Sequence, residues 1–272
     1  MIAEATPAKP RASVEERVEK LLKTVSASRL GTWHGCKMKF YFRYVLEIKK
    51  PPTPALHSGS VAHLVLQAWN KARWRGEAFN PALLRLLFDA QWTAAQTGQQ
   101  IRWDGEEDKE REATWRALEN YFAQTPIQST DRPEAVEAKI EADLSSHGLP
   151  NLVGVLDLVR AGRRIVDFKI TAKTPDSGMV AHMHSVQLSC YGVLYRDATG
   201  QEESGFELHH IVKTKTPKLV VTALAPIQER HQTRLFRAIN SYADGLSRKD
   251  FVPSPGFGCA ACDYFNECRA FD

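Results

Sequence analysis

Three charged residues, Asp157, Asp167 and Lys169, lie within two apolar runs of the stretch 152–170, which reads LVGVLDLVRAGRRIVDFKI. Two short runs rich in β-branched residues flank a Gly-containing turn, a pattern that predicts a β-hairpin. Asp157 lies in the first run, and Asp167 and Lys169 lie in the second. Burying an unpaired carboxylate is energetically costly, so the pattern predicts that these charges are paired or bound to metal.

Asp167 and Lys169 are two residues apart and therefore point to the same face of their strand. If the hairpin register brings Asp157 alongside, two carboxylates and one ammonium converge. Mg²⁺ and Mn²⁺ prefer oxygen ligands and retain several waters, so two carboxylates and a backbone carbonyl suffice to hold one ion. Such an ion can activate water for phosphodiester hydrolysis, and the lysine can orient or deprotonate that water. The alternative for the same residues is a salt bridge within the hairpin.

The composition, with 43% hydrophobic and 25% charged residues among 272, is typical of a soluble globular protein. We expect one large domain, or one domain with an appendage. No run approaches the ~20 apolar residues of a membrane span, and the N-terminus lacks an apolar signal core, so we expect a cytoplasmic protein. The net charge is +4, and residues 29–50 carry six Lys or Arg against the single acid Glu47. This imbalance is compatible with a polyanionic partner.

Five cysteines without a secretory signal argue against a disulfide scaffold. Three of them, Cys259, Cys262 and Cys268, form a C-x2-C-x5-C pattern near the end of the sequence. A closed tetrahedral or cluster site needs a fourth ligand, and Cys36 is the candidate. Cys190 falls inside a helical pattern and is expected to be a buried small hydrophobe.

Periodicity predicts a mixed sheet with flanking helices, a fold of the α/β (α+β) class. We expect strands at 134–144, 152–159, 165–170, about 206–214 and 219–224. We expect helices at 14–25, 26–45, 58–74, 81–97, about 107–122, 185–198 and 226–248. Ser58 or Ser60 is expected to cap the third helix, which would place His63 in its first turn as a candidate ligand. Glu137 and Glu141 share one face of the first strand and are expected to be solvated rather than catalytic.

Four short motifs follow one another in the order His, G-x-x-D, D-x-K and Q-x-x-x-Y. Their residues are His63, Gly154 to Asp157, Asp167 to Lys169, and Gln187 to Tyr191. This order resembles the PD-(D/E)XK nuclease superfamily, and specifically its RecB-like branch. The four cysteines resemble the iron–sulfur version of that branch, which CRISPR-adaptation nucleases and the AddB-type nuclease domain share.

The resemblance implies a restriction-endonuclease-like core with a mixed central sheet flanked by helices. A tail and helix at 1–25 would precede a single nuclease domain at 26–272. A helical insertion would lie at about 80–125, and the cysteine tail at 253–272 would join the N-terminal helix through the cluster.

The resemblance also implies a role for each site residue. Asp157 and Asp167 would bind Mg²⁺ or Mn²⁺, helped by His63 and by the backbone carbonyl of Phe168. Lys169 would position the attacking water or stabilise the charged phosphate. Gln187 would orient the lysine or the scissile strand, and Tyr191 would support it. Cys36, Cys259, Cys262 and Cys268 would hold a structural [4Fe–4S] cluster, with zinc as the alternative.

The implied function is a metal-dependent DNA nuclease, an exonuclease acting on single strands or duplex ends. DNA recombination and repair, CRISPR adaptation and phage DNA processing all fit. Because the sequence lacks the P-loop pattern G-x-x-x-x-G-K-[ST], a partner would be a separate helicase or a recombination or CRISPR protein. The alternatives are a catalytically silent nucleic-acid-binding or assembly subunit with the same fold, and a zinc-stabilised DNA-binding or redox-active protein.

Overall fold

The computed structural model describes residues 13–77, 80–96 and 100–271. The first twelve residues of the expected N-terminal tail lie outside this range. No helix in the described part of the chain combines the length and apolarity that crossing a membrane requires.

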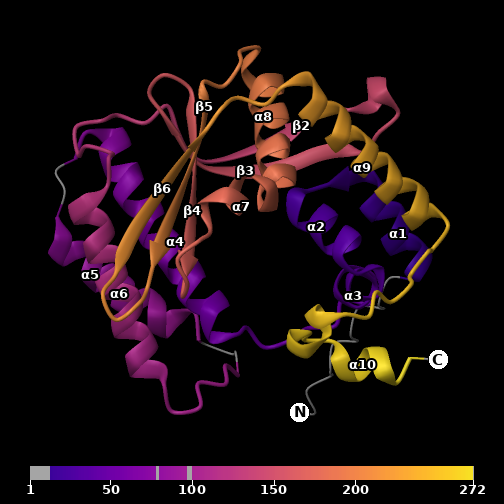
Figure 1. Cartoon of the computed structure of the whole chain (residues 1–272), viewed down its shortest axis with the longest axis horizontal. Coiled ribbons are helices and arrows are strands. Elements are labelled where there is room, and N and C mark those ends of the chain that lie inside the picture. The colour runs from indigo at the N-terminus through magenta and orange to yellow at the C-terminus, as the bar shows by residue number, and fades with distance from the viewer. Residues whose placement is uncertain (1–12, 78–79, 97–99, 272) are drawn as a thin grey trace, which may run out of the picture.

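A mixed β-sheet forms the centre of the molecule, as the sequence predicts (Figure 1). Its strands are β1 (Thr24–Val25), β2 (Ala135–Ala142), β3 (Asn151–Arg160), β4 (Arg164–Thr171), β5 (Gly205–Val212) and β6 (Lys218–Leu224). The strand order is β1-β3-β4-β5-β6, and β2 pairs with β3. Strands β2, β3 and β4 form an antiparallel meander, β4 and β5 are parallel, and β5 and β6 form an antiparallel pair. The predicted fold class and central hairpin are therefore confirmed.

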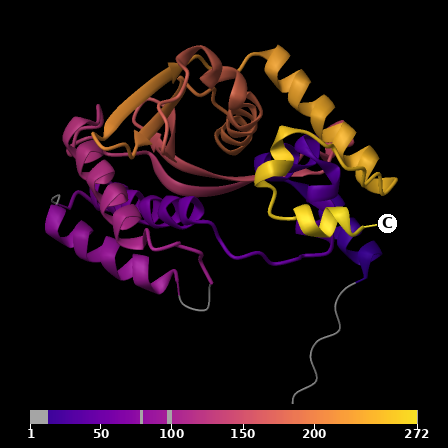
Figure 2. The same ribbon diagram turned by 60° about the horizontal axis from the view of Figure 1, so that its bottom comes forward.

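Helices cover both faces of the sheet (Figure 2). The N-terminal helical segments are α1 (Val14–Lys23), α2 (Ala27–Gly35), α3 (Lys37–Phe40) and the π-helical turn η1 (Tyr41–Val45). The middle helices are α4 (Pro54–Arg75), α5 (Pro81–Ala94) and α6 (Glu107–Gln124). The remaining helices are α7 (Ser177–Met183), α8 (Ser185–Thr199), α9 (Glu229–Ser247) and α10 (Phe265–Arg269). Two short 3-10 turns, η2 (Ser145–His147) and η3 (Phe257–Ala261), complete the described segments.

Two apolar cores lie on opposite faces of the sheet. One core packs α4, α5 and α6 against alternate residues of β4, such as Val166 and Phe168. The other core packs α1, α2, α8 and α9 against the opposite face, which carries Ile165. Since successive side chains of a strand point to opposite faces, β4 also directs Asp167 and Lys169 toward the face that α8 covers.

The N-cap of helix α4 lies five residues before Ser58 and seven before Ser60, the two serines expected to cap it. Thr53 is the N-cap, its side chain accepts a hydrogen bond from Leu56 N–H, and Pro54 occupies the first helical position, which proline favours. The expected cap at Ser58 or Ser60 is therefore wrong. His63 lies in the third turn of α4 and not in the first, so the helix N-terminus is too far away to influence it.

The helix expected over 26–45 is interrupted at Cys36, whose extended backbone (φ −161°, ψ 113°) separates α2 from α3. The break turns the chain so that Met38 and Phe42 pack against Tyr264 of the C-terminal segment. Figure 2 shows this segment, in yellow, lying against the indigo N-terminal helices. The two ends of the described chain are therefore joined through a small third core.

Candidate active site

The hairpin strands β3 and β4 separate where the acidic residues stand. Their ladder pairs Arg160 with Arg164, Val159 with Ile165 and Leu158 with Val166, and ends there. Continuing this register places Asp157 directly opposite Asp167. Beyond the ladder, the backbone N–H of Phe168 donates a hydrogen bond to Asp157 Oδ2 at 3.0 Å in place of a strand partner. Both carboxylates therefore stand at the fork of two diverging strands.

Asp167 is 2% exposed and lies among three side chains. Its Oδ1 accepts hydrogen bonds from Gln187 Nε2 at 2.9 Å and from the Tyr191 hydroxyl at 3.2 Å. Its Oδ2 lies 2.8 Å from the Lys169 ammonium as an ion pair, but no hydrogen bond of good geometry reaches this buried oxygen. The Oδ2 atom therefore keeps lone pairs available for a cation.

Gln187 connects the lysine to the carboxylate. Its Oε1 accepts a hydrogen bond from Lys169 Nζ at 3.0 Å, and its Nε2 donates to the Tyr191 hydroxyl at 2.8 Å. Gln187 and Tyr191 are four residues apart on α8 and share one helix face, as their spacing predicts. One helix face thus fixes both the ammonium and the carboxylate of the D-x-K motif.

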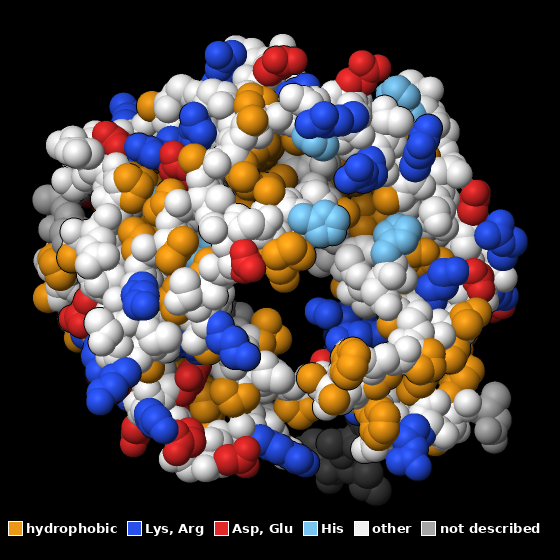
Figure 3. Space-filling view, in the orientation of Figure 1, with side chains coloured by type: hydrophobic (Ala, Val, Ile, Leu, Met, Phe, Trp, Pro, Cys, Tyr) orange, Lys and Arg blue, Asp and Glu red, His pale blue; other side chains and the backbone are white. Residues whose placement is uncertain are grey.

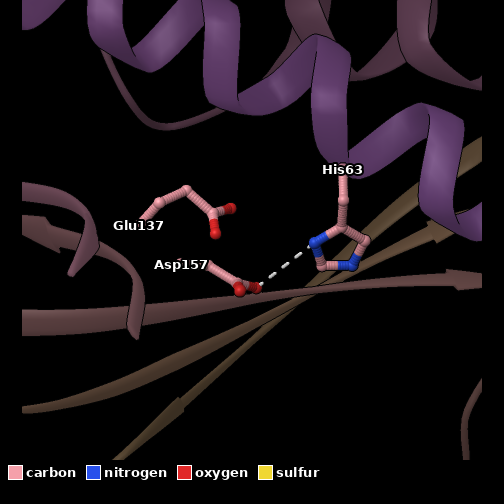
Figure 4. Close-up of side chains that lie close together, drawn as sticks. All are labelled: His63, Glu137 and Asp157. Atoms are coloured by element: carbon pink, nitrogen blue, oxygen red, sulfur yellow. Dashed lines mark ion pairs between the residues drawn. The ribbon is translucent and has the colours of Figure 1, made fainter. Parts of the chain in front are cut away.

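A second group of side chains gathers around Asp157 (Figure 4). His63 extends from α4 and places Nδ1 3.6 Å from Asp157 Oδ2. Glu137 of β2 completes a group whose ligand atoms all lie within 4.8 Å of one another. Among the described residues, no other set of three His, Cys, Asp or Glu ligand atoms meets this spacing. A histidine and two carboxylates at such distances can share one divalent ion.

The expectation that Glu137 belongs to a solvated strand face is wrong. Its backbone is left-handed (φ 50°), which is uncommon for a residue other than glycine. This conformation changes the alternation of β2, because Val136 packs against the core below α4 whereas Ala138 packs against the core below α8. Glu137 lies opposite Asp157 in the β2–β3 register. Strict alternation along the strand could not predict this position of Glu137. The predicted meander did place Glu137 close to a motif aspartate, and that neighbourhood could have marked it as a candidate ligand.

The carboxylates of the site are crowded and partly desolvated. Burial, and then the charge of Asp167, raises the pKa of Asp157 from its ordinary value to about 6. Burial likewise raises the pKa of Glu137. Both shifts mean that negative charge here is costly without a counter-ion. Oxygen donors, one imidazole and an unsatisfied buried Asp167 oxygen are a donor set that fits a hard divalent cation.

We expect Asp157→Asn to stabilise the metal-free protein at pH 7.5. The folded state raises the pKa of Asp157, so it binds the proton more tightly than the unfolded chain does. This carboxyl therefore disfavours folding increasingly as pH rises from about 4 to about 6, and fully above that. Thermal unfolding in EDTA should show a melting temperature higher by about 5 °C for the variant at pH 7.5. The melting temperatures of the two proteins should converge near pH 4. A lower melting temperature of the variant at pH 7.5 would contradict the claim that the charged Asp157 carboxylate destabilises the metal-free fold.

Four of the five cysteines lie near one another at the junction of the two chain ends. Cys36, Cys262 and Cys268 all pack against the small core of Met38, Phe42 and Tyr264. Burial, followed by the charges of Cys36, Cys262 and Cys259, raises the pKa of the Cys268 thiol. Cys190, by contrast, is buried inside α8, as expected. The four expected ligands therefore gather, and the fifth cysteine lies elsewhere.

The sequence between residues 24 and 269 matches the family model of the PD-(D/E)XK nuclease superfamily. The match spans nearly the whole chain, and the chain belongs to this superfamily. No curated protein sequence matches it.

Among solved structures, a "Putative exonuclease" from Eubacterium rectale is similar in fold, with a TM-score of 0.60 at 12% identity. The similarity covers 97% of this chain and 94% of that one. The structure of SSO0001 matches over 94% of both chains, with a TM-score of 0.40 at 11% identity. At such identities the first similarity supports the fold alone. The second, with its lower TM-score, adds no support.

Proposed function

We propose that this protein is a divalent-metal-dependent deoxyribonuclease that acts on single strands or DNA ends. One observation carries the proposal: the group of His63, Glu137 and Asp157 stands beside the Asp167–Lys169–Gln187 network at one fork of the sheet. A nuclease needs a site for a cation and a cationic side chain next to it, facing the same phosphate. Membership of the superfamily agrees with this chemistry.

In this proposal His63, Asp157 and Asp167 hold Mg²⁺ or Mn²⁺, with Glu137 and the Phe168 carbonyl as further donors. The ion supplies Lewis acidity and lowers the pKa of a coordinated water when it is bound. The Phe168 N–H holds Asp157 in place by its hydrogen bond to Oδ2. The remaining acceptor capacity of each carboxylate then faces the cation rather than the backbone.

Lys169 places a fixed positive charge where the scissile phosphate would gain negative charge. Gln187 accepts from the ammonium and donates to Asp167, so it sets the distance between the two. Tyr191 accepts from Gln187 and donates to the same Asp167 oxygen, which fixes the amide orientation. Preorganised charge of this kind stabilises the transition state without reorganisation during the reaction.

An opening near the centre of the molecule supports the preference for a single strand. Figure 3 shows this opening, with Lys and Arg side chains along part of its wall. Elements that border it in Figure 1 also line a groove of about 1050 Å³ between the N-terminal helices, the start of α4 and the C-terminal segment. Six cationic and two acidic residues line the groove: Arg17, Lys20, Arg29, Arg43, Lys49 and Lys50, with Glu47 and Asp263. Tyr44 in its lining is a candidate for stacking on bases.

Reversing three groove charges together, Lys20→Glu, Arg43→Glu and Lys49→Glu, should weaken binding of a single-stranded oligonucleotide. None of the three forms an ion pair with another described residue, so their charge is available to phosphates. The slope of log affinity against log salt should become shallower by about 2, at roughly 0.7 per lost phosphate contact.

Fluorescence anisotropy over a salt series measures that slope. The matched control reverses Arg230, Arg234 and Arg237, which line a shallow pocket on the outer helix α9. An equal loss of oligonucleotide affinity in the groove variant and in the control would contradict the claim that the groove binds the strand.

The proposal assigns a [4Fe–4S] cluster to Cys36, Cys259, Cys262 and Cys268. Cys36, Cys262 and Cys268 contact one small core, and the charges of Cys36, Cys262 and Cys259 all act on Cys268, which supports a single centre held by the four thiols. Its role would be structural, since the site joins both chain ends away from the β3–β4 fork.

Digestion of end-labelled DNA by anaerobically purified protein tests the proposed activity. Linear single strands with 5′ or 3′ labels, blunt duplex and circular single strands are each incubated with Mg²⁺, Mn²⁺ or EDTA. We expect degradation of linear strands with either ion, none in EDTA, and resistance of the circle. Binding without cleavage under all metal conditions would instead identify a catalytically silent subunit. Repair, CRISPR adaptation and phage DNA processing, each with a separate helicase or assembly partner, are the settings we propose for the activity.

A further inference from the structure

Two histidines outside the proposed catalytic group lie beside Lys169. His210 of β5 pairs in register with Lys169 of the parallel neighbour β4, so both side chains leave the same face of the sheet. His210 is 3% exposed. His184 directly precedes α8, and its ring centroid lies 5.9 Å from that of His210. Figure 1 places α7, which ends just before His184, above the central opening.

One ring nitrogen of His210 has no partner. Its Nδ1 is buried without a hydrogen bond among the described residues, although the ring has a backbone partner at Leu208. Burial, and then the charges of His184 and Lys169, lowers the pKa of His210, while Asp167 opposes this shift. A neutral imidazole keeps one acceptor nitrogen. A buried acceptor without a donor is unfavourable, so its neighbourhood should contain a donor that reaches it in some state of the protein.

Lys169 has a donor to spare. Its ammonium carries three N–H groups, and in this structure it contacts Gln187 Oε1 and Asp167 Oδ2. A divalent ion at Asp167 would compete with the ammonium for Oδ2 and repel it. Lys169 would then need another acceptor to keep its position, and its register neighbour is His210.

We propose that His210 is a positioning residue for Lys169. When a divalent ion occupies Asp167, a ring nitrogen of His210 accepts a hydrogen bond from the Lys169 ammonium. This inference depends on one part of the proposed function, the binding of a divalent ion at Asp167, and does not require that the protein cleaves DNA. His184 supports the arrangement from the other side, because its ring lies against the His210 ring. Burial and the Lys169 charge lower the pKa of His184 as well, which disfavours a positive charge on this ring next to the ammonium.

Three substitutions of nearly equal size test this. His210→Leu removes the acceptor, whereas His210→Asn and His210→Gln place an amide oxygen near one ring nitrogen or the other. With Mg²⁺ present, His210→Leu should lower kcat about tenfold or more, the size of a lost hydrogen bond to a charged group, with KM changed less than about twofold. At least one amide variant should restore most of the rate. Full activity of His210→Leu would overturn the proposal.

A second measurement does not depend on cleavage. Trace acetylation followed by mass spectrometry gives the reactivity of Lys169 relative to the exposed Lys173 in the same molecule. Losing an acceptor disfavours the charged ammonium, so Lys169 in His210→Leu should react severalfold faster in Mg²⁺. His184→Leu should also raise the reactivity of Lys169 relative to Lys173, but by a smaller factor. This second variant provides the test if His210→Leu does not fold. An unchanged ratio in whichever of these variants fold overturns the inference, whereas a wild type that never cleaves DNA overturns only the proposed function.

Discussion

Replacing Lys169 with alanine is expected to abolish most DNA cleavage while leaving the fold and the metal site intact. In the described part of the chain, the Lys169 ammonium is the one cationic group that pairs with Asp167, 2.8 Å from Oδ2, and Gln187 fixes its position. Loss of a group that orients water or stabilises the charged phosphate costs about 10²- to 10⁴-fold in rate. Single-turnover digestion of a labelled single strand with saturating Mn²⁺ measures this directly.

Lys173→Ala is the matched control, because it removes an exposed lysine four residues further along the chain. It should cleave at the rate of the wild type. Thermal unfolding of Lys169→Ala should remain cooperative, which separates lost chemistry from lost structure. Cleavage by Lys169→Ala within threefold of the wild-type rate would remove the lysine from the mechanism.

Replacing Cys36 with serine is expected to remove the cluster and release the C-terminal segment. Among the described residues, the buried cluster at this junction consists of Met38, Phe42 and Tyr264. The segment also contacts the N-terminal helices through the ring of Phe271, the ion pair of Lys50 with Glu267 and the hydrogen bond from the Tyr264 hydroxyl to Ile48 O at 3.0 Å. A cross-link between residues so far apart in the sequence would stabilise this junction by reducing the entropy of the unfolded chain, so its loss should release the segment.

Iron and sulfide analysis of anaerobically purified protein should give about four of each per chain for the wild type and almost none for Cys36→Ser. Limited proteolysis should then cut the variant within residues 253–271. Cys190→Ala is the control, since this cysteine is buried in α8 and its variant should keep the cluster. One zinc and no iron in the wild type would replace the cluster with the zinc alternative.

The hairpin and the site around it could be predicted because local patterns determine them. The apolar runs around a short turn specify β3 and β4, and the two-residue spacing places Asp167 and Lys169 on one face. The four-residue spacing of Gln187 and Tyr191 does the same on α8. In each case the relative placement of the two side chains depends only on the geometry of a single strand or helix.

Features that depend on contacts between distant segments could not be predicted. Glu137 leaves the strand alternation because its backbone is left-handed, and no pattern in β2 signals this. The pairing of β1 with the start of β3 rests on two residues, Thr24 and Val25, too few for any periodicity. His210 became visible only through its register with Lys169, which the parallel β4–β5 pairing sets.

The start of α4 and the break at Cys36 show a different limit. Several capping residues compete at the start of α4, and Thr53 with Pro54 prevails because proline favours the first helical position. At Cys36, helical periodicity continues through the break, and packing against the C-terminal segment decides the backbone. Tertiary contacts therefore override a regular local pattern.

Binding of Mn²⁺ to the metal-free protein tests the central claim, that His63, Asp157 and Asp167, with Glu137 as a further donor, hold a divalent ion at the strand fork. Calorimetry at pH 7.5 should show one strong site in the wild type. Asp157→Asn should abolish it, Glu137→Gln should weaken it about tenfold, and Glu141→Gln, on the exposed part of β2, should leave it unchanged. Equal Mn²⁺ affinity in wild type and Asp157→Asn would contradict the account.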